Sequence, residues 1–250
     1  MPYISSSEQK LFKDLDTFGL KSDIEIKGKV LIKINLARVY WQNHPRTDIS
    51  ILKQLITYIY QNGGTCAIAE GANGYLQKNL YTSGLEELLK LHKVKIIDAD
   101  IEDYDEVVSN GERHYIPKIF KEYPVRIAMP SASKRVGMHY SNNIKLFVGA
   151  VPRKMYQLDD GEVIGHAPRA RLHQNLDQSI ANLFMAMKEY SPFHYYVNGG
   201  LSYNENIGEF NFDEILIGND ALKLDLHVFQ KYFSDCVCPD YLGIVAAKEK

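Results

Sequence analysis

The stretch Val30-Leu-Ile-Lys-Ile-Asn35 decides the fold of this chain. Its aliphatic residues are interrupted by a single lysine, a pattern typical of a buried strand. From Asp48 onward, apolar residues recur at helical spacing up to residues 62–64, with Thr47 or Asp48 available as the N-cap and two glycines as the stop. Residues 65–69 then predict a second buried strand.

These three segments predict a βαβ unit, in which a helical crossover makes the two strands parallel. Asn35 and Glu70 stand at the ends of the two strands. Because the carboxyl ends of parallel strands meet at one edge of a sheet, both residues should lie at that edge. Ligands bind there in open α/β sheets.

The rest of the chain continues the alternation of strands and helices. We expect strands at 94–97, 125–129, 194–197 and 214–217, a hairpin-like segment between the first two, and helices at 80–91, 142–149, 176–190 and 221–233. The fold class is therefore α/β: a mixed, largely parallel sheet with βαβ units and helices on both faces. We expect residues 1–250 to form a single domain. The alternative divides it near Pro130 into two closely packed subdomains, a βαβ subdomain at 1–130 and a second α/β subdomain at 131–250.

Composition narrows the class of protein. The 250 residues are 45% hydrophobic and 24% charged, which argues against disorder. The net charge of −2 gives no global positive field, so neither nucleic acid nor a membrane surface is an expected partner. No apolar run approaches the roughly 20 residues that span a bilayer. The expected compartment is the cytoplasm, and the three cysteines are too few for a disulfide scaffold.

Lys33 and Glu70 are the first candidates for chemistry. An ammonium inside an apolar strand needs a carboxylate or a ligand anion, because an unpaired buried charge is costly. Lys33 could also be an edge lysine whose head reaches water. Glu70, next to Gly71, could be a general base or a metal ligand, or could form a salt bridge to Lys33.

Other polar residues admit two interpretations each. Arg46 precedes a helix N-terminus, where it could grip a carboxylate or phosphate, or could simply pair with Asp48 on the surface. Asn35 could be a turn residue. Lys145 lies in a short segment that leads to Gly149, and it could be either a positioned base or a solvated lysine on the outer face of a helix.

Eight motifs, taken together, resemble the family called domain of unknown function 362. They are 30–36, 45–48, Gly63-Gly64, Glu70-Gly71, 127–130 with Lys134, 144–149, 197–199 and 220–225. The match should span nearly residues 30 to 230. The family is grouped with nickel-pincer lactate racemases as a distant superfamily, and some members carry an iron–sulfur module whose cysteines are missing here. This chain does not match the paired histidines of those racemases, so we expect no nickel and no other cofactor or metal.

The first hypothesis for function is an isomerase, namely a cofactor-independent racemase or epimerase that inverts a carbon next to a carboxylate or carbonyl by proton transfer. Such a reaction needs bases on both faces of a carbanion and cations to stabilise it. The candidate catalytic residues are Lys33, Glu70, Lys134, His139 and Lys145. The candidate residues that bind a small anionic organic substrate are Asn35, Arg46, Asn73, Asn142, His173 and Asn198.

The second hypothesis is an anion-binding or iron–sulfur-linked redox accessory protein without turnover of its own. The same basic residues and helix N-termini would bind an anion without proton chemistry. In either case a homodimer is compatible with the sequence.

Overall fold

A computed structural model describes residues 3–6, 10–36, 46–137, 139–157 and 169–249. Pro45, which belongs to one of the family motifs, lies outside these residues. The strands are β1 (Tyr3–Ser6), β2 (Lys29–Ile34), β3 (Thr65–Glu70), β4 (Lys95–Asp98), β5 (Tyr104–Ser109), β6 (Glu112–Pro117), β7 (Val125–Met129), β8 (Ser133–Lys134), β9 (Tyr195–Asn198), β10 (Leu201–Asn204), β11 (Gly208–Asn211) and β12 (Ile215–Gly218).

The α-helices are α1 (Leu11–Thr17), α2 (Leu20–Lys27), α3 (Ile49–Gln61), α4 (Leu76–Ser83), α5 (Glu86–Leu91), α6 (Asn143–Leu146), α7 (Leu176–Tyr190), α8 (Ala221–Tyr232) and α9 (Asp240–Lys248). Short 3-10 helices also occur, namely η1 (Lys118–Glu122), η2 (Phe147–Ala150), η3 (Arg153–Tyr156) and η4 (Ala170–His173).

A seven-stranded sheet in the order β1-β12-β9-β7-β2-β3-β4 organises the molecule. Its five strands from β9 to β4 are parallel, and β12 and β1 add antiparallel pairings at one side. The predicted βαβ unit is confirmed, since β2 and β3 are parallel neighbours joined by α3, and Asp48 caps that helix by accepting from the Ile51 N–H (2.9 Å). The sheet takes strands from both sides of residue 130, so the two subdomains considered above would share it.

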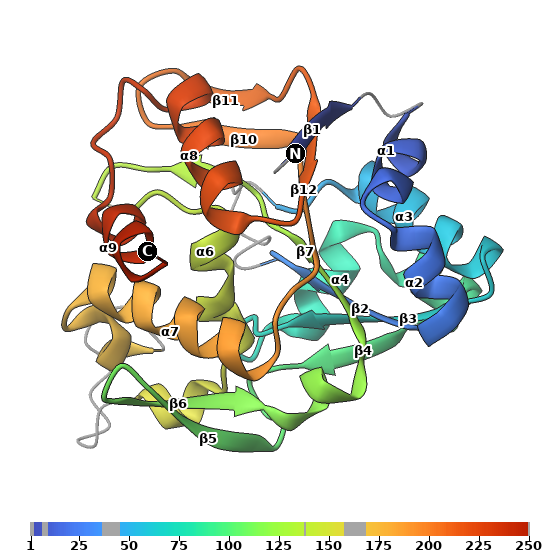
Figure 1. Ribbon diagram of the computed structural model, residues 1–250, viewed down its shortest axis with the longest axis horizontal. Helices are drawn as coiled ribbons and strands as arrows, with labels where there is room; N and C mark the ends of the chain where they lie inside the picture. Colours follow the sequence, from blue (N-terminus) through green and yellow to red (C-terminus); the bar gives the residue numbers. More distant parts are fainter. Residues whose placement is uncertain (1–2, 7–9, 37–45, 138, 158–168, 250) are drawn as a thin grey trace.

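Helices cover both faces of this sheet, as Figure 1 shows. Val30, Ile32 and Ile34 of β2 belong to the core that packs with α1 to α5, whereas Leu31 belongs to the core on the side of α6 to α9. This alternation follows from the two-residue period of a strand. Lys33 therefore extends toward the side of α6. The mixed, largely parallel α/β class is thus confirmed.

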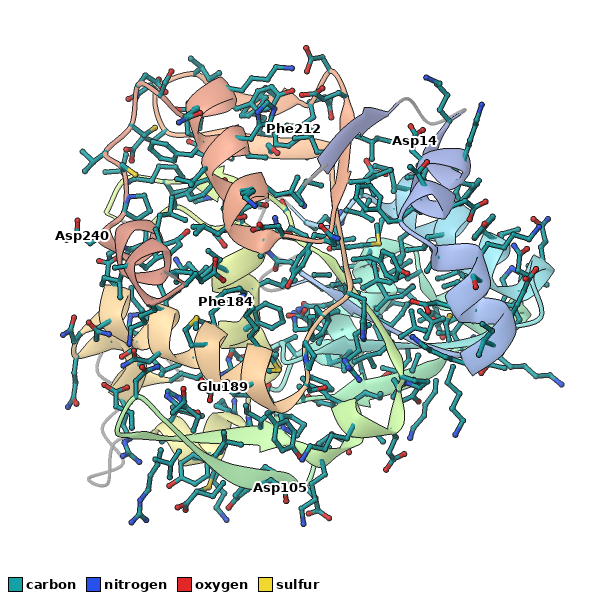
Figure 2. All side chains as sticks on the ribbon, in the orientation of Figure 1. Asp14, Asp105, Phe184, Glu189, Phe212 and Asp240 are labelled. Atoms are coloured by element: carbon teal, nitrogen blue, oxygen red, sulfur yellow. The ribbon has the colours of Figure 1, made fainter. Side chains whose placement is uncertain are left out.

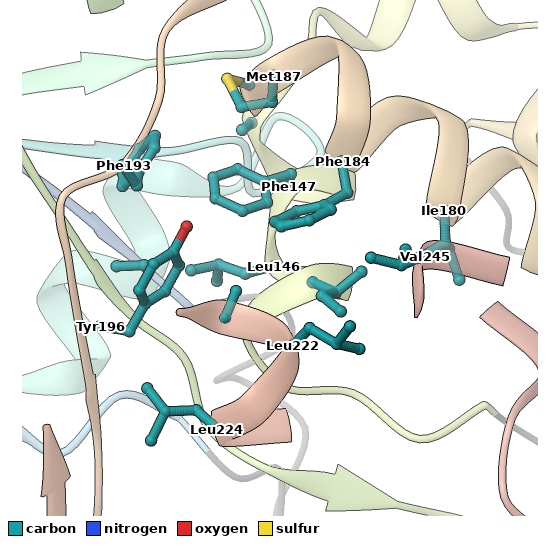
Figure 3. Close-up of a cluster of buried hydrophobic side chains, with 14 of the residues drawn as sticks. Leu146, Phe147, Ile180, Phe184, Met187, Phe193, Tyr196, Leu222, Leu224 and Val245 are labelled. Carbon is teal, nitrogen blue, oxygen red and sulfur yellow. The ribbon is translucent and has the colours of Figure 1, made fainter. Parts of the chain in front are cut away.

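The core on the α6 side is built from aromatic and aliphatic side chains that are far apart in the sequence. Figure 3 shows Phe147 of η2 among Phe184 and Met187 of α7, with Leu222 of α8 and Val245 of α9 nearby. Buried side chains of this size contribute about 1.5 to 3 kcal/mol each. This core fixes α6 and η2 between the sheet and the outer helices.

Two smaller β units complete the fold. The expected hairpin is confirmed as β5 and β6, which pack against α7 (Figure 1). A three-stranded sheet, β11-β10-β8, pairs β8 with β10 in parallel. Among the described residues, no helix is long and apolar enough to cross a membrane.

The structure differs from the sequence expectation at residues 80–91. Two helices, α4 and α5, replace the single helix that we expected. Gly84 adopts a left-handed conformation (φ 71°) and ends α4. Glycine is favoured at such a position because it has no Cβ to collide with the backbone.

Candidate active site at the carboxyl edge of the sheet

A short segment made of α6 and η2 crosses the carboxyl edge of the parallel strands. At one end, Asn142 donates from its amide to the Oδ1 atom of Asn198, the last residue of β9 (2.7 Å). At the other end, the carbonyl oxygen of Gly149 accepts from the N–H of Gly71, which follows β3 (2.8 Å). The segment therefore spans the edge where ligands bind in sheets of this kind.

Asp225 of α8 fixes the start of α6. Its carboxylate accepts from the N–H groups of Asn143 and Ile144 (3.0 Å each), and from the side-chain amide of Asn143 (2.8 Å). Burial raises the pKa of Asp225 to about 7, and these N–H donors act in the opposite direction. Backbone donors at the start of a helix have no partner within the helix, so a carboxylate from α8 satisfies them.

Lys33 and Glu70 form an ion pair inside the protein. The Lys33 ammonium lies 2.8 Å from Glu70 Oε2 and donates to the carbonyl oxygen of Ile34 (2.6 Å). Their side chains are 0% and 2% exposed. Burial lowers the pKa of Lys33 and raises that of Glu70, while the attraction between the two charges opposes both shifts. This geometry matches the salt-bridge interpretation of the sequence.

Glycines let the crossing segment approach this ion pair. A Cβ atom at Gly149 would lie 3.4 Å from Lys33 Nζ, and one at Gly71 would lie 2.7 Å from the Gly149 carbonyl oxygen. The latter distance is too short for a real Cβ atom. Gly71 is therefore required for the contact between β3 and η2.

A second buried charge pair lies at the same edge of the sheet, next to the end of β4. Arg169 Nη2 lies 2.5 Å from Asp100 Oδ1, and its Nη1 donates to Asn73 Oδ1 (2.7 Å). Arg153 donates to the carbonyl oxygen of Asn73 (2.8 Å). Asn73 thus serves here as an acceptor that binds two arginines, and the charge of Arg169 is balanced by Asp100.

The third group of polar residues surrounds Lys145. The Lys145 ammonium donates to the carbonyl oxygen of His139 (3.3 Å), and His139 Nδ1 lies 3.3 Å from Asp177 Oδ1. Lys134 pairs with Glu205 of the β10–β11 turn (3.1 Å). The pKa of Lys145 is lowered to about 8, mainly by burial; the Asp177 charge opposes this shift and the Lys134 charge adds to it.

The structure thus brings the sequence candidates together in pairs. Lys33 contacts Glu70, Asn142 contacts Asn198, and Lys145 contacts His139, whereas Lys134 affects Lys145 through its charge. The Asn35 backbone bonds to Thr47, Arg46 is half-buried ahead of α3, and His173 lies exposed in η4. That Asn35, Arg46, Glu70, Lys134 and Lys145 line one cleft stays a prediction.

Sequence reasoning missed four acidic or basic residues of this edge, namely Asp100, Arg169, Asp177 and Asp225. Asp225 carried a signal in the sequence, because it lies three residues after Leu222 and three before Val228, on the apolar face of an amphipathic helix. The structure shows it fully buried. Within the described part of the chain, no three His, Cys, Asp or Glu residues cluster in a way that could hold a metal ion.

The sequence of this chain was compared with models of known protein families. A family model described as domain of unknown function (DUF362) matches residues 30–230. The chain belongs to this family. The DUF362 match runs from β2 into α8, so it includes both the Lys33–Glu70 pair and Asp225. No curated protein matches the chain. The distant relationship to lactate racemases stays a prediction.

A double-mutant cycle tests the role of the Lys33–Glu70 pair. We expect Lys33→Met and Glu70→Leu each to lower the free energy of unfolding by about 3 to 5 kcal/mol, because each leaves a buried charge without its partner. The double variant should stay near the wild-type value. Urea unfolding followed by circular dichroism measures all four proteins. A double variant as unstable as the sum of the two single variants would contradict a mainly structural pair.

Proposed function

We propose that this protein is an isomerase, a racemase or epimerase that moves a proton at a carbon next to a carboxylate or carbonyl, with Lys145 as a base. The substrate is a small anionic organic molecule. We also propose that the enzyme is cytoplasmic and that it works without a cofactor. The proposal is supported by the half-buried Lys145 amine, which its hydrogen bond to the His139 carbonyl oxygen holds at the carboxyl edge of the sheet, and whose pKa burial lowers to about 8.

The lowered pKa matters because only a neutral amine accepts a proton. A lysine with an ordinary pKa near 10.4 is almost fully protonated at neutral pH. Burial and a second cation bring Lys145 into the range where a useful fraction is neutral and the amine is still basic. Its hydrogen bond to the His139 carbonyl oxygen holds the amine in place.

Cations near the base would stabilise the negative charge that develops on the substrate. Lys134 is close enough to Lys145 to change its pKa, although its own charge is paired with Glu205. Arg46, half-buried before α3, supports the proposal as a clamp for the substrate carboxylate. A carbanion next to a carboxylate needs such preorganised positive charge.

Deuterium exchange tests this function directly. Single enantiomers of 2-hydroxy acids and amino acids, incubated in D₂O, should lose the α-proton signal in ¹H NMR with one substrate class and the wild-type protein. Lys145→Arg should slow the exchange of at least one enantiomer by about 100-fold or more, because a guanidinium keeps the charge but does not act as a base. Circular dichroism checks that the variant folds.

Lys154→Arg is the matched control, since Lys154 is exposed in η3 and should be replaced without effect. Exchange at the background rate across the whole panel would contradict the isomerase and favour an accessory protein that binds anions without turnover. Full exchange by Lys145→Arg would remove Lys145 from the reaction.

The pH profile of the exchange provides a second prediction. The rate should rise with pH through a midpoint near 8, because the neutral amine is the active form. Lys134→Met should move this midpoint to higher pH, because it removes a positive charge that lowers the pKa of Lys145. Lys154→Met should leave the midpoint in place. A midpoint that is unchanged or lower in Lys134→Met would contradict the coupling of the two lysines.

A further inference from the structure

We infer that His139, oriented by Asp177, is the second acid–base group of this site. The inference rests on the proposed isomerase function, and it adds Asp177 as a positioning residue that acts through His139. In this inference α9 helps to hold the site, because its residue Tyr241 bonds to Asp177. Three contacts carry it, and they link the loop before α6, the first turn of α7 and the start of α9.

The first contact indicates which ring nitrogen of His139 should carry hydrogen. His139 Nδ1 lies 3.3 Å from Asp177 Oδ1, and an ionised carboxylate only accepts hydrogen bonds. A bare Nδ1 lone pair that faces this carboxylate would be repelled by it, so we expect Nδ1 to carry the hydrogen. In the neutral ring this leaves Nε2 as the nitrogen with a free lone pair, which is the form that accepts a proton.

The second contact fixes the carboxylate itself. Asp177 Oδ1 also accepts from the backbone N–H of Tyr241 in α9 (3.1 Å). Asp177 is thus held by α9 as well as by its own helix, α7. A carboxylate held on two sides keeps the imidazole in one orientation, as in catalytic His–Asp pairs generally.

The third contact joins His139 to the proposed base. Lys145 Nζ donates to the backbone carbonyl oxygen of His139 (3.3 Å), and the Asp177 charge raises the pKa of Lys145. The side chains of His139 and Asp177 are 33% and 21% exposed, so the ring is partly accessible to a small molecule. The Lys145 amine is therefore bonded to the backbone of the same residue whose ring we infer to be the second acid–base group.

Inversion at a carbon needs two such groups. In one direction, the neutral Lys145 amine takes the α-proton, and the His139 imidazolium delivers a proton to the opposite face of the carbanion. The amine becomes an ammonium and the imidazolium becomes a neutral imidazole, so the number of protons on the enzyme is unchanged. In the other direction, the roles reverse.

The ring tautomer tests the orientation independently of any substrate. Two-dimensional ¹H–¹⁵N NMR of imidazole-labelled protein should show the neutral His139 ring protonated at Nδ1, and His139→Gln assigns its signals. In Asp177→Asn, the carboxylate charge that favours hydrogen on Nδ1 is removed, so the share of the ring protonated at Nε2 should rise. A wild-type ring protonated at Nε2 would overturn the inference.

Asp240→Asn is the matched control for this substitution. Asp240 lies exposed in the first turn of α9, next to Tyr241, and Figure 2 labels it at the outer side of that helix. The control removes a carboxylate from the start of α9, next to the residue that bonds to Asp177, but leaves the surroundings of the His139 ring unchanged. It should leave the His139 tautomer unchanged.

Enantiomer-resolved exchange tests the acid–base role. Lys145→Arg should lose the exchange of one enantiomer and His139→Gln that of the other, each by about 100-fold or more, while the opposite enantiomer keeps a measurable rate. Asp177→Asn should follow His139→Gln. Equal loss of both enantiomers, or no loss, in His139→Gln would overturn the inference even if the isomerase function holds. If the wild-type protein exchanges none of the substrates, the proposed function is wrong. The tautomer experiment would still test whether Asp177 orients the His139 ring.

Discussion

The carboxylate of Asp225 holds the structure of the candidate site together. It accepts from the N–H groups of Asn143 and Ile144, at the start of a helix of only four residues. A helix of this length has no stability of its own, because forming the first turn costs more than its few hydrogen bonds return. The position of Lys145 in α6 therefore depends on a side chain from α8 and on the aromatic core beneath η2.

Buried charge pairs divide the carboxyl edge into two parts. Beyond β2, the Lys33–Glu70 and Arg169–Asp100 pairs are enclosed, and each charge meets its opposite within 2.8 Å. Burying such a pair costs desolvation energy and favours one arrangement of the chain. Because each charged group is bonded to its partner, it is not available to bind a substrate or to transfer a proton. The groups that keep acid–base capacity lie in α6, which packs against β7, and in the loop before it. Lys145 bonds only to a backbone carbonyl among the contacts described above, and His139 is partly exposed.

Local patterns in the sequence were sufficient for the central βαβ unit. The spacing of apolar residues predicted β2, α3 and β3, and the capping role of Asp48 is confirmed by its bond to the N–H group three residues later. The carboxyl edge followed from parallel strands alone. Each of these features depends on residues close in the chain, where periodicity and capping give a direct signal.

The rest of the site depends on contacts between distant residues. Asp225 meets α6 across 82 residues, and Arg169 meets Asp100 across 69, and no spacing rule relates such partners. The role of Asp177 could not be predicted either. An acidic residue in the first turn of a helix is ordinarily explained by its interaction with the helix dipole. α9 also escaped sequence analysis, although Tyr241 and Val245 bury it against α7 and α8.

The central claim is that the fold lowers the pKa of the Lys145 amine to about 8, so that a useful fraction is neutral near physiological pH. The most direct measurement is an NMR titration of the lysine side chains in ¹³C-lysine-labelled protein, with the Lys145 signal assigned by its disappearance in Lys145→Arg. The account predicts a midpoint of about 8 for Lys145, below those of the exposed lysines. A Lys145 midpoint that coincides with the exposed lysines, near 10.4, would contradict it.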